Sequence, residues 1–92
     1  MADSVARELW LPESVCDEVV GEIQRAIGKH GDQSTLPDCV WLAIATEEIG
    51  EVAEAVLAEG FGKPDPGHTD EEIVQSIAVL VHWLEIRRMR RE

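Results

Sequence analysis

The sequence predicts an all-α fold with three main helices in a single domain spanning residues 1–92. Clusters of Gly and Pro interrupt the chain at two places, and the three segments that they separate carry apolar residues at helical spacing. No run of useful length alternates apolar and polar residues, so a β-sheet is not indicated. A chain of 92 residues is also too short for a catalytic domain plus a separate regulatory one.

The three helices are expected over residues 12–28, 38–59 and 69–91. The first has an apolar face with four-residue spacing, formed by Val15, Val19, Ile23 and Ile27. The connector KHGDQSTLPD separates it from the second helix, which Gly60 is expected to end in a left-handed conformation. The third helix is expected to begin at Thr69 with a capping box that includes Glu72. Its basic last turn suits the helix dipole.

Charge and cysteine content exclude several classes of function. Nineteen acidic and eight basic residues give a formal net charge of −11, which repels nucleic-acid backbones and anionic lipid headgroups. We therefore expect neither nucleic acid nor a membrane as a partner. No secretion signal and no apolar stretch of about 18 residues is evident. Cys16 and Cys39 lack disulfide-framework or zinc spacing, which favours a cytoplasmic protein.

Two carboxylates lie on the apolar side of the second predicted helix. At about 100° per residue, its apolar arc consists of Trp41, Ile44, Ala45, Ile49, Val52, Ala55 and Val56. Glu48 falls inside this arc and Glu51 lies at its edge. A charged carboxylate that faces a core costs several kcal/mol unless it is paired, protonated or bound to a cation. Glu48 is therefore either a cation ligand or the salt-bridge partner of Arg25 or Lys29.

The third predicted helix shows the same anomaly. Its apolar residues cover about two thirds of its circumference and are Ile73, Ile77, Val79, Leu80, Val81, Trp83, Leu84 and Ile86. Glu72 lies within this arc, and Gln75 lies at its edge. Helical bundles build carboxylate metal sites from such polar i, i+3 pairs on two facing helices. The capping box is the alternative role for Glu72, and a phase error of one residue would substitute Glu47 or Glu71 for a neighbour.

The carboxylate spacing resembles that of a known family. Residues 47–55 read EEIGEVAEA, and residues 72–75 read EIVQ. Over about residues 30–86 the chain resembles the MazG-like family of all-α nucleoside triphosphate pyrophosphatases. That family carries an ExxE motif on one helix and an ExxD motif on the next, and these carboxylates hold Mg²⁺ against the substrate phosphates. Glu48 and Glu51 match the first motif and Glu72 begins the second, in which Gln75 stands where the family has Asp.

The resemblance implies hydrolysis of a nucleoside triphosphate to the monophosphate and pyrophosphate, as nucleotide-pool house-cleaning. Mg²⁺ is the implied cofactor, with Mn²⁺ as the alternative. The implied metal ligands are Glu48, Glu51, Glu72 and Gln75. The implied catalytic residues are Glu47 and Glu48, of which Glu47 would orient or deprotonate the attacking water.

Substrate-binding residues are expected around the first connector and after the second helix. Lys29 and Lys63 are candidates for phosphate binding, because phosphates require cations from the protein. His30, Gln33 and Trp41 border the expected nucleotide pocket, where His and amide groups can bind a base edge and Trp can stack. The simpler interpretation is a surface His and a core Trp.

Gln75 keeps other classes of function open. An amide oxygen can ligate a hard cation but adds no charge, so Mg²⁺ should bind less tightly than with Asp. One alternative is a non-catalytic helical dimer that binds a nucleotide or a partner protein at a degenerate site. Another is a structural helical module in which all interior carboxylates are salt-bridged and no metal binds.

The width of the apolar arc on the third helix predicts a homodimer or a dimer of dimers. Two neighbouring helices of a 92-residue chain cannot cover an arc of about 240°. We expect a second copy to cover Val79, Trp83 and Ile86 and to complete a bundle across a two-fold axis. The family resemblance also implies a dimer, with pockets bordered by both chains.

Overall fold

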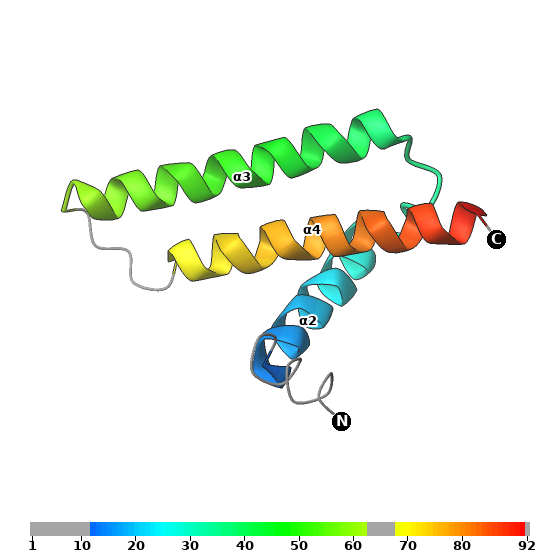
Figure 1. The fold of residues 1–92 in the computed structure, drawn as a ribbon, viewed down its shortest axis with the longest axis horizontal. Coiled ribbons are helices and arrows are strands. Elements are labelled where there is room, and N and C mark those ends of the chain that lie inside the picture. Colours follow the sequence, from blue (N-terminus) through cyan, green and yellow to red (C-terminus); the bar gives the residue numbers. More distant parts are fainter. Residues whose placement is uncertain (1–11, 63–67, 92) are drawn as a thin grey trace, which may run out of the picture.

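The computed structural model describes residues 12–62 and 68–91, and all regular structure within them is helical. With the labels of Figure 1, α2 spans Glu13–His30, α3 spans Asp38–Gly60 and α4 spans His68–Arg91. This confirms the expected all-α class with three helices, and each helix end lies within two residues of its expected position. No helix in the described ranges is both long enough and apolar enough to cross a bilayer.

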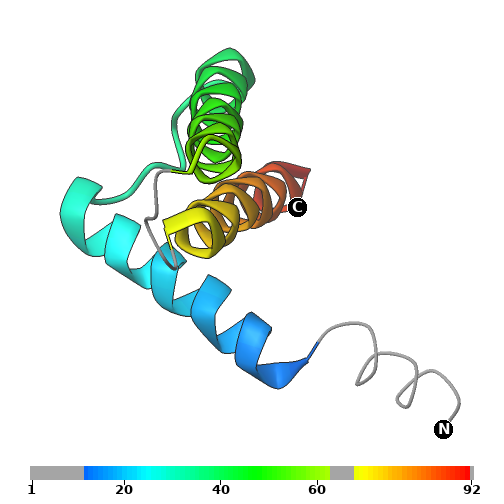
Figure 2. The same ribbon diagram turned by 90° about the vertical axis from the view of Figure 1, so that its left-hand side faces the viewer.

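Helix α4 lies between the other two helices. It runs antiparallel to α3, and α2 crosses α4 on the side away from α3 (Figures 1 and 2). Because α4 packs against two helices, it needs apolar residues around much of its circumference, as its sequence shows. The buried apolar side chains are Val19, Trp41, Ala45, Ala55, Ala78 and Ile86.

The connector between α2 and α3 is short and held by local hydrogen bonds. Helix α2 continues through Lys29 and His30, two residues further than expected, and ends at Gly31, whose φ of 74° favours glycine. The Asp32 carboxylate accepts the backbone N–H of Ser34 at 2.9 Å and its hydroxyl at 3.0 Å. This turn directs the chain into α3.

The expected left-handed conformation at Gly60 is wrong. Gly60 is the last residue of α3, and the positive φ of 75° belongs to Gly62. In this turn the N–H of Phe61 donates to the carbonyl of Leu57, and the N–H of Gly62 donates to the carbonyl of Glu59, each at 3.1 Å. The left-handed residue therefore lies two positions after the first glycine of the GFG sequence, although the helix itself ends at that glycine.

Asp38, the first residue of α3, joins that helix to the C-terminal half of α4. Its carboxylate accepts Nε1–H of Trp83 at 2.9 Å, Nη1–H of Arg90 at 3.2 Å and a further hydrogen bond from Arg87. Arg90 also donates to the backbone carbonyls of Ser34 and Leu36. The basic end of α4 thus binds the connector and the start of α3, in addition to complementing its own helix dipole.

The apolar arcs are only partly buried. Within α3, Trp41, Ala45 and Ala55 are buried as expected, but Ile49 is 53% exposed and Val56 is 50% exposed. On α4, Ile86 is buried, and Val79 and Trp83 are half-buried within the chain itself. The chain itself therefore covers Ile86, contrary to the expectation for that residue, whereas cover of Val79 and Trp83 by a second copy stays a prediction. The exposed large apolar residues of α4 are Ile73, Ile77, Leu80, Val81, Leu84 and Met89.

Candidate metal centre

Three carboxylates from two helices converge beside the packed surfaces of α3 and α4. Glu48 and Glu51 lie one turn apart on α3, and Glu72 lies in the second turn of α4. One carboxylate oxygen from each residue lies within 4.8 Å of the other two. We call these three residues the acidic cluster. Their convergence follows from the i, i+3 spacing on α3 and the antiparallel packing of α4.

The acidic cluster is poorly solvated and poorly compensated. Glu72 is only 7% exposed, and Oε2 atoms of both Glu72 and Glu48 are buried without a hydrogen-bond partner. Burial raises the pKa of Glu72, and hydrogen bonding and repulsion from Glu51 raise that pKa further. Burial followed by repulsion from Glu51 also raises the pKa of Glu48. Such a site costs stability unless protons or a cation neutralise it.

The alternative role of Glu72 as a capping-box partner does not match the structure. Thr69 lies within α4 and donates its hydroxyl hydrogen to Oε1 of Glu59 on α3. The Glu72 carboxylate instead lies 3.4 Å from Nε2 of His68, one turn earlier on the same helix. Glu72 is therefore available to the acidic cluster.

The proposed salt bridge for Glu48 is also replaced by another pair. Arg25 binds Glu22 on its own helix, with Nη2 of Arg25 2.9 Å from Oε2 of Glu22. Burial has the largest effect on the pKa of Glu48 and raises it, whereas Arg25 lowers this pKa only weakly. Among the described residues, Glu48 thus faces the interior without a direct ion-pair partner.

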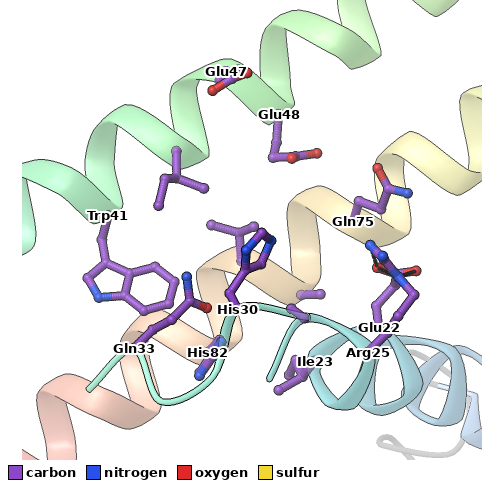
Figure 3. Close-up of a pocket in the computed structure, with 14 residues that line it drawn as sticks. Glu22, Ile23, Arg25, His30, Gln33, Trp41, Glu47, Glu48, Gln75 and His82 are labelled. Atoms are coloured by element: carbon purple, nitrogen blue, oxygen red, sulfur yellow. Dashed lines mark hydrogen bonds and ion pairs between the residues drawn. The ribbon is translucent and has the colours of Figure 1, made fainter. Parts of the chain in front are cut away.

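A pocket of about 460 Å³ adjoins the acidic cluster through Glu48. Helix α2 forms one wall, and α3 and α4 form the others (Figure 3). At one end lie the polar side chains of Glu22, Arg25, Glu47, Glu48 and Gln75. This volume falls within the range of small-ligand pockets, about 300–1,000 Å³.

The other end of the pocket is aromatic and carries few charges. Trp41 is 2% exposed, and its ring centroid lies 5.0 Å from that of His82 in an edge-to-face arrangement. Burial lowers the pKa of His82, which favours its neutral imidazole. His30 and Gln33 complete this end (Figure 3). Nε1 of Trp41 is buried without an acceptor, so Trp41 offers the edge of its ring, not its N–H, to the pocket.

The structure brings together most of the expected site residues. Glu47 and Gln75 line the pocket beside Glu48, as do His30, Gln33 and Trp41 at the aromatic end. Lys29 is exposed in the last turn of α2 and does not line the pocket. Lys63 lies outside the described residues. The sequence analysis did not assign Glu22 or His82 to the pocket, and it considered Arg25 only as a partner of Glu48.

Helical phase alone places one of these residues, His82, on the pocket side of its helix. His82 lies seven residues after Gln75, so both occupy the same side of α4. Glu22 and Arg25 are three residues apart, which is the spacing of an ion pair on one helix. Their location at the pocket depends on how α2 crosses α4, and that angle cannot be obtained from the helical phase.

Comparisons with known proteins give no further assignment. No model of a known protein family matches the chain, and no curated protein and no solved structure matches it either. The functional argument therefore depends on the chain's own residues and on the resemblance of its carboxylate motifs.

Proposed function

We propose that this protein is a MazG-like, Mg²⁺-dependent nucleoside triphosphate pyrophosphohydrolase that acts as a homodimer. The acidic cluster carries the proposal. Its three carboxylates converge from the ExxE sequence of α3 and from Glu72 on α4, and two of them have a buried oxygen without a hydrogen-bond partner. Glu48 also lines the pocket, whose far end is aromatic. Cys16 and Cys39 are free, which is compatible with action in the reducing cytoplasm.

The donor set fits a hard divalent cation. Mg²⁺ and Mn²⁺ prefer oxygen ligands, and Glu48, Glu51 and Glu72 would supply carboxylate oxygens from a site whose charges are otherwise poorly compensated. Gln75 lies in the pocket wall near Glu48 and would add a neutral amide oxygen (Figure 3). A bound cation would neutralise developing charge on the phosphate oxygens and lower the pKa of a coordinated water.

Of the remaining pocket residues, Glu47 would activate the water and the others would bind the nucleotide. The exposed Glu47 carboxylate borders the pocket next to Glu48, where it would orient the attacking water and accept its proton. Trp41 would contact the base with the edge of its ring, and His30, Gln33 and His82 would bind the remaining edge or face of the base. The polar end would thus hold the phosphates and the aromatic end the base.

An uncovered apolar surface supports the homodimer. We call the following residues the apolar face: Leu42, Ile49 and Val56 on α3, and Ile73, Ile77, Leu80 and Leu84 on α4. On both helices these residues lie on the flank away from the pocket-lining side chains, so they form one continuous surface of the α3–α4 pair. Heptad-like spacing on each helix is typical of helix packing in bundles.

The charges at the ends of this surface favour a second copy as its partner. Asp70 lies in the first turn of α4, and Arg88 and Arg91 lie in its last turn, on the side that continues the apolar face. If two copies of α4 pack antiparallel across a two-fold axis, the acidic end of one helix meets the basic end of the other. Stable interfaces of this kind bury about 1,600 Å² or more in total.

The test is pyrophosphate release from a panel of canonical and altered nucleoside triphosphates with Mg²⁺ or Mn²⁺, for the wild-type protein and Glu48→Gln. We expect release that requires the metal and is abolished in Glu48→Gln, while helical content is kept. Without metal, Glu48→Gln should be at least as stable as wild type, because it removes a desolvated carboxylate. Metal-dependent release at the wild-type rate in Glu48→Gln would exclude Glu48 from the site.

A non-catalytic nucleotide-binding dimer is the second candidate, and Gln75 is the observation that favours it. The pocket wall carries an amide where the family has a carboxylate, so one negative charge is missing beside the acidic cluster. Calorimetric binding of nucleoside triphosphates without any pyrophosphate release would support this function. The structural module is less consistent with the molecule, because it requires that interior carboxylates are salt-bridged. Glu72 lies close to His68, but no ion pair involves Glu48 among the described residues, and one buried oxygen of each carboxylate lacks a hydrogen-bond partner.

A further inference from the structure

The pocket contains a single basic side chain that is permanently charged. Among its lining residues, which all belong to the described ranges, Arg25 is the only Lys or Arg. The same lining contains the carboxylates of Glu22, Glu47 and Glu48. A triphosphate carries about four negative charges at neutral pH, so it requires compensation from a protein cation as well as from any metal.

Arg25 is already engaged in the geometry that a phosphate would require. Its Nε lies 3.0 Å and 3.1 Å from the two carboxylate oxygens of Glu22, and its Nη2 lies 2.9 Å from Oε2. The planar guanidinium fork fits two oxygens of a carboxylate or a phosphate equally well. Glu22 thus occupies the donor groups that an incoming phosphate would use.

The ion pair of Arg25 and Glu22 lies where a phosphate can replace Glu22 with little loss of stability. Both residues rise from α2 into the polar end of the pocket, below Gln75 and across from Glu48 (Figure 3). The Arg25 side chain is 56% exposed, so it can change rotamer without disturbing the core. Exposed i, i+3 ion pairs contribute little to stability, and a phosphate dianion can therefore compete with Glu22 for the guanidinium.

We propose that Arg25 binds the substrate phosphates by leaving Glu22, and that Glu22 competes with phosphate for Arg25 in the empty pocket. This inference rests on the proposed function, since that function supplies the triphosphate. It replaces the expected phosphate-binding role of Lys29, which does not line the pocket. Arg25 is then a substrate-binding residue, and Glu22 sets the affinity for phosphate.

The experiment measures binding of inorganic tripolyphosphate by calorimetry in the presence of Mg²⁺, which removes any dependence on base preference. Arg25→Gln should weaken binding about 10- to 100-fold, the loss expected for charge-assisted hydrogen bonds. Arg25→Lys keeps the charge without the fork and should give a smaller loss. Glu22→Gln should tighten binding several-fold, and the double variant should behave like Arg25→Gln.

Lys29 provides the matched control. It is exposed one turn further along α2 and does not line the pocket. Lys29→Gln removes one positive charge from the same helix and should leave tripolyphosphate binding unchanged. Equal affinities of wild type, Arg25→Gln and Lys29→Gln would overturn the role of Arg25, and weaker binding in Glu22→Gln would overturn the competition.

Pyrophosphate release separates this inference from the proposed function. Wild-type release together with tripolyphosphate binding that ignores Arg25 would overturn the inference alone. Absence of release from every nucleoside triphosphate would overturn the proposed pyrophosphohydrolase, even if tripolyphosphate binds through Arg25. Absence of tripolyphosphate binding to the wild-type protein would overturn the inference directly.

Discussion

The indole Nε1–H of Trp83 donates to Oδ1 of Asp38 at 2.9 Å and so links the C-terminal half of α4 to the first residue of α3. Arg87 and Arg90 bind the same carboxylate. These contacts fix the end of the α3–α4 pair that borders the α2–α3 connector, and hence the wall of the pocket formed by that connector.

Replacing Asp38 with Asn should lower the thermal midpoint at pH 7 and flatten the loss of stability in acid. The hydrogen bond from Trp83, followed by Arg87 and Arg90, lowers the pKa of Asp38. A lowered pKa of an acid stabilises the folded state above the ordinary pKa of about 4, and this stabilisation disappears as the pH falls through the folded-state pKa. The difference between wild type and Asp38→Asn should therefore shrink below about pH 4.

Thermal melts between pH 2 and pH 8 check this expectation. Asp17→Asn, at an exposed position of α2, is the matched control and should follow the wild-type pH dependence. A constant offset between wild type and Asp38→Asn at every pH would contradict an electrostatic role for Asp38.

The two described tryptophans should respond differently to replacement with Phe. Nε1 of Trp83 has an acceptor, so Trp83→Phe should lose about 1–2 kcal/mol of the free energy of unfolding. Trp41 is 2% exposed and its Nε1 has no acceptor, so Trp41→Phe loses no hydrogen bond but leaves a cavity beside the pocket. Trp41→Phe should also weaken nucleotide binding about tenfold if the indole ring contacts the base. Urea unfolding and calorimetry with nucleoside monophosphates measure the two effects. Unchanged nucleotide affinity in Trp41→Phe would remove the indole from the base site.

Gln75→Asp should tighten Mg²⁺ binding on the order of tenfold and raise the rate of pyrophosphate release, because it restores a charge beside the acidic cluster. The metal-free variant should be less stable, since a further carboxylate adds repulsion near Glu48. Gln24→Asp on the exposed side of α2 is the matched control and should leave Mg²⁺ affinity unchanged. A decrease in both metal affinity and rate would mean that the site depends on the amide of Gln75.

Leu80→Glu should convert a dimer into a monomer. Leu80 is 46% exposed at the middle of the apolar face, and a charge buried there would weaken association on the order of 100-fold or more. Sedimentation of the wild-type protein should give twice the chain mass of 10.2 kDa at micromolar concentration. Val20→Glu, at an exposed apolar position of α2 outside the apolar face, should remain dimeric. A folded wild-type monomer at this concentration would contradict the dimer itself.

The helices and the acidic cluster could be predicted from sequence because both depend on local periodicity. The carboxylates at Glu48 and Glu72 stand out against an apolar background at helical spacing, and the antiparallel hairpin then brings them together. The left-handed residue could not be predicted in this way, because the GFG sequence offers two glycines that tolerate a positive φ. The structure has the positive φ at Gly62 and not at Gly60.

The tertiary arrangement could not be obtained in the same way. Helical phase shows that α4 is apolar around most of its circumference, but it does not show which arc α2 and α3 cover. The structure buries Ile86, which was expected at the dimer surface, and leaves Leu80, another residue of the arc, 46% exposed. The position of Arg25 in the pocket likewise depends on how α2 crosses α4, which the sequence does not specify.

The acidic cluster draws its oxygens from two separate helices, so its dimensions depend on how far α3 is displaced along α4. A shift of one residue moves a ligand by about 1.5 Å along the helix axis, far more than the variation of about 0.2 Å that metal–ligand distances tolerate. The small buried side chains of Ala45, Ala55 and Ser76 allow close approach of the helix backbones and help to set that displacement. If the acidic cluster binds the proposed cation, enlarging one of them would alter ion affinity and selectivity while leaving every carboxylate in the chain, so that core packing would help to determine metal choice.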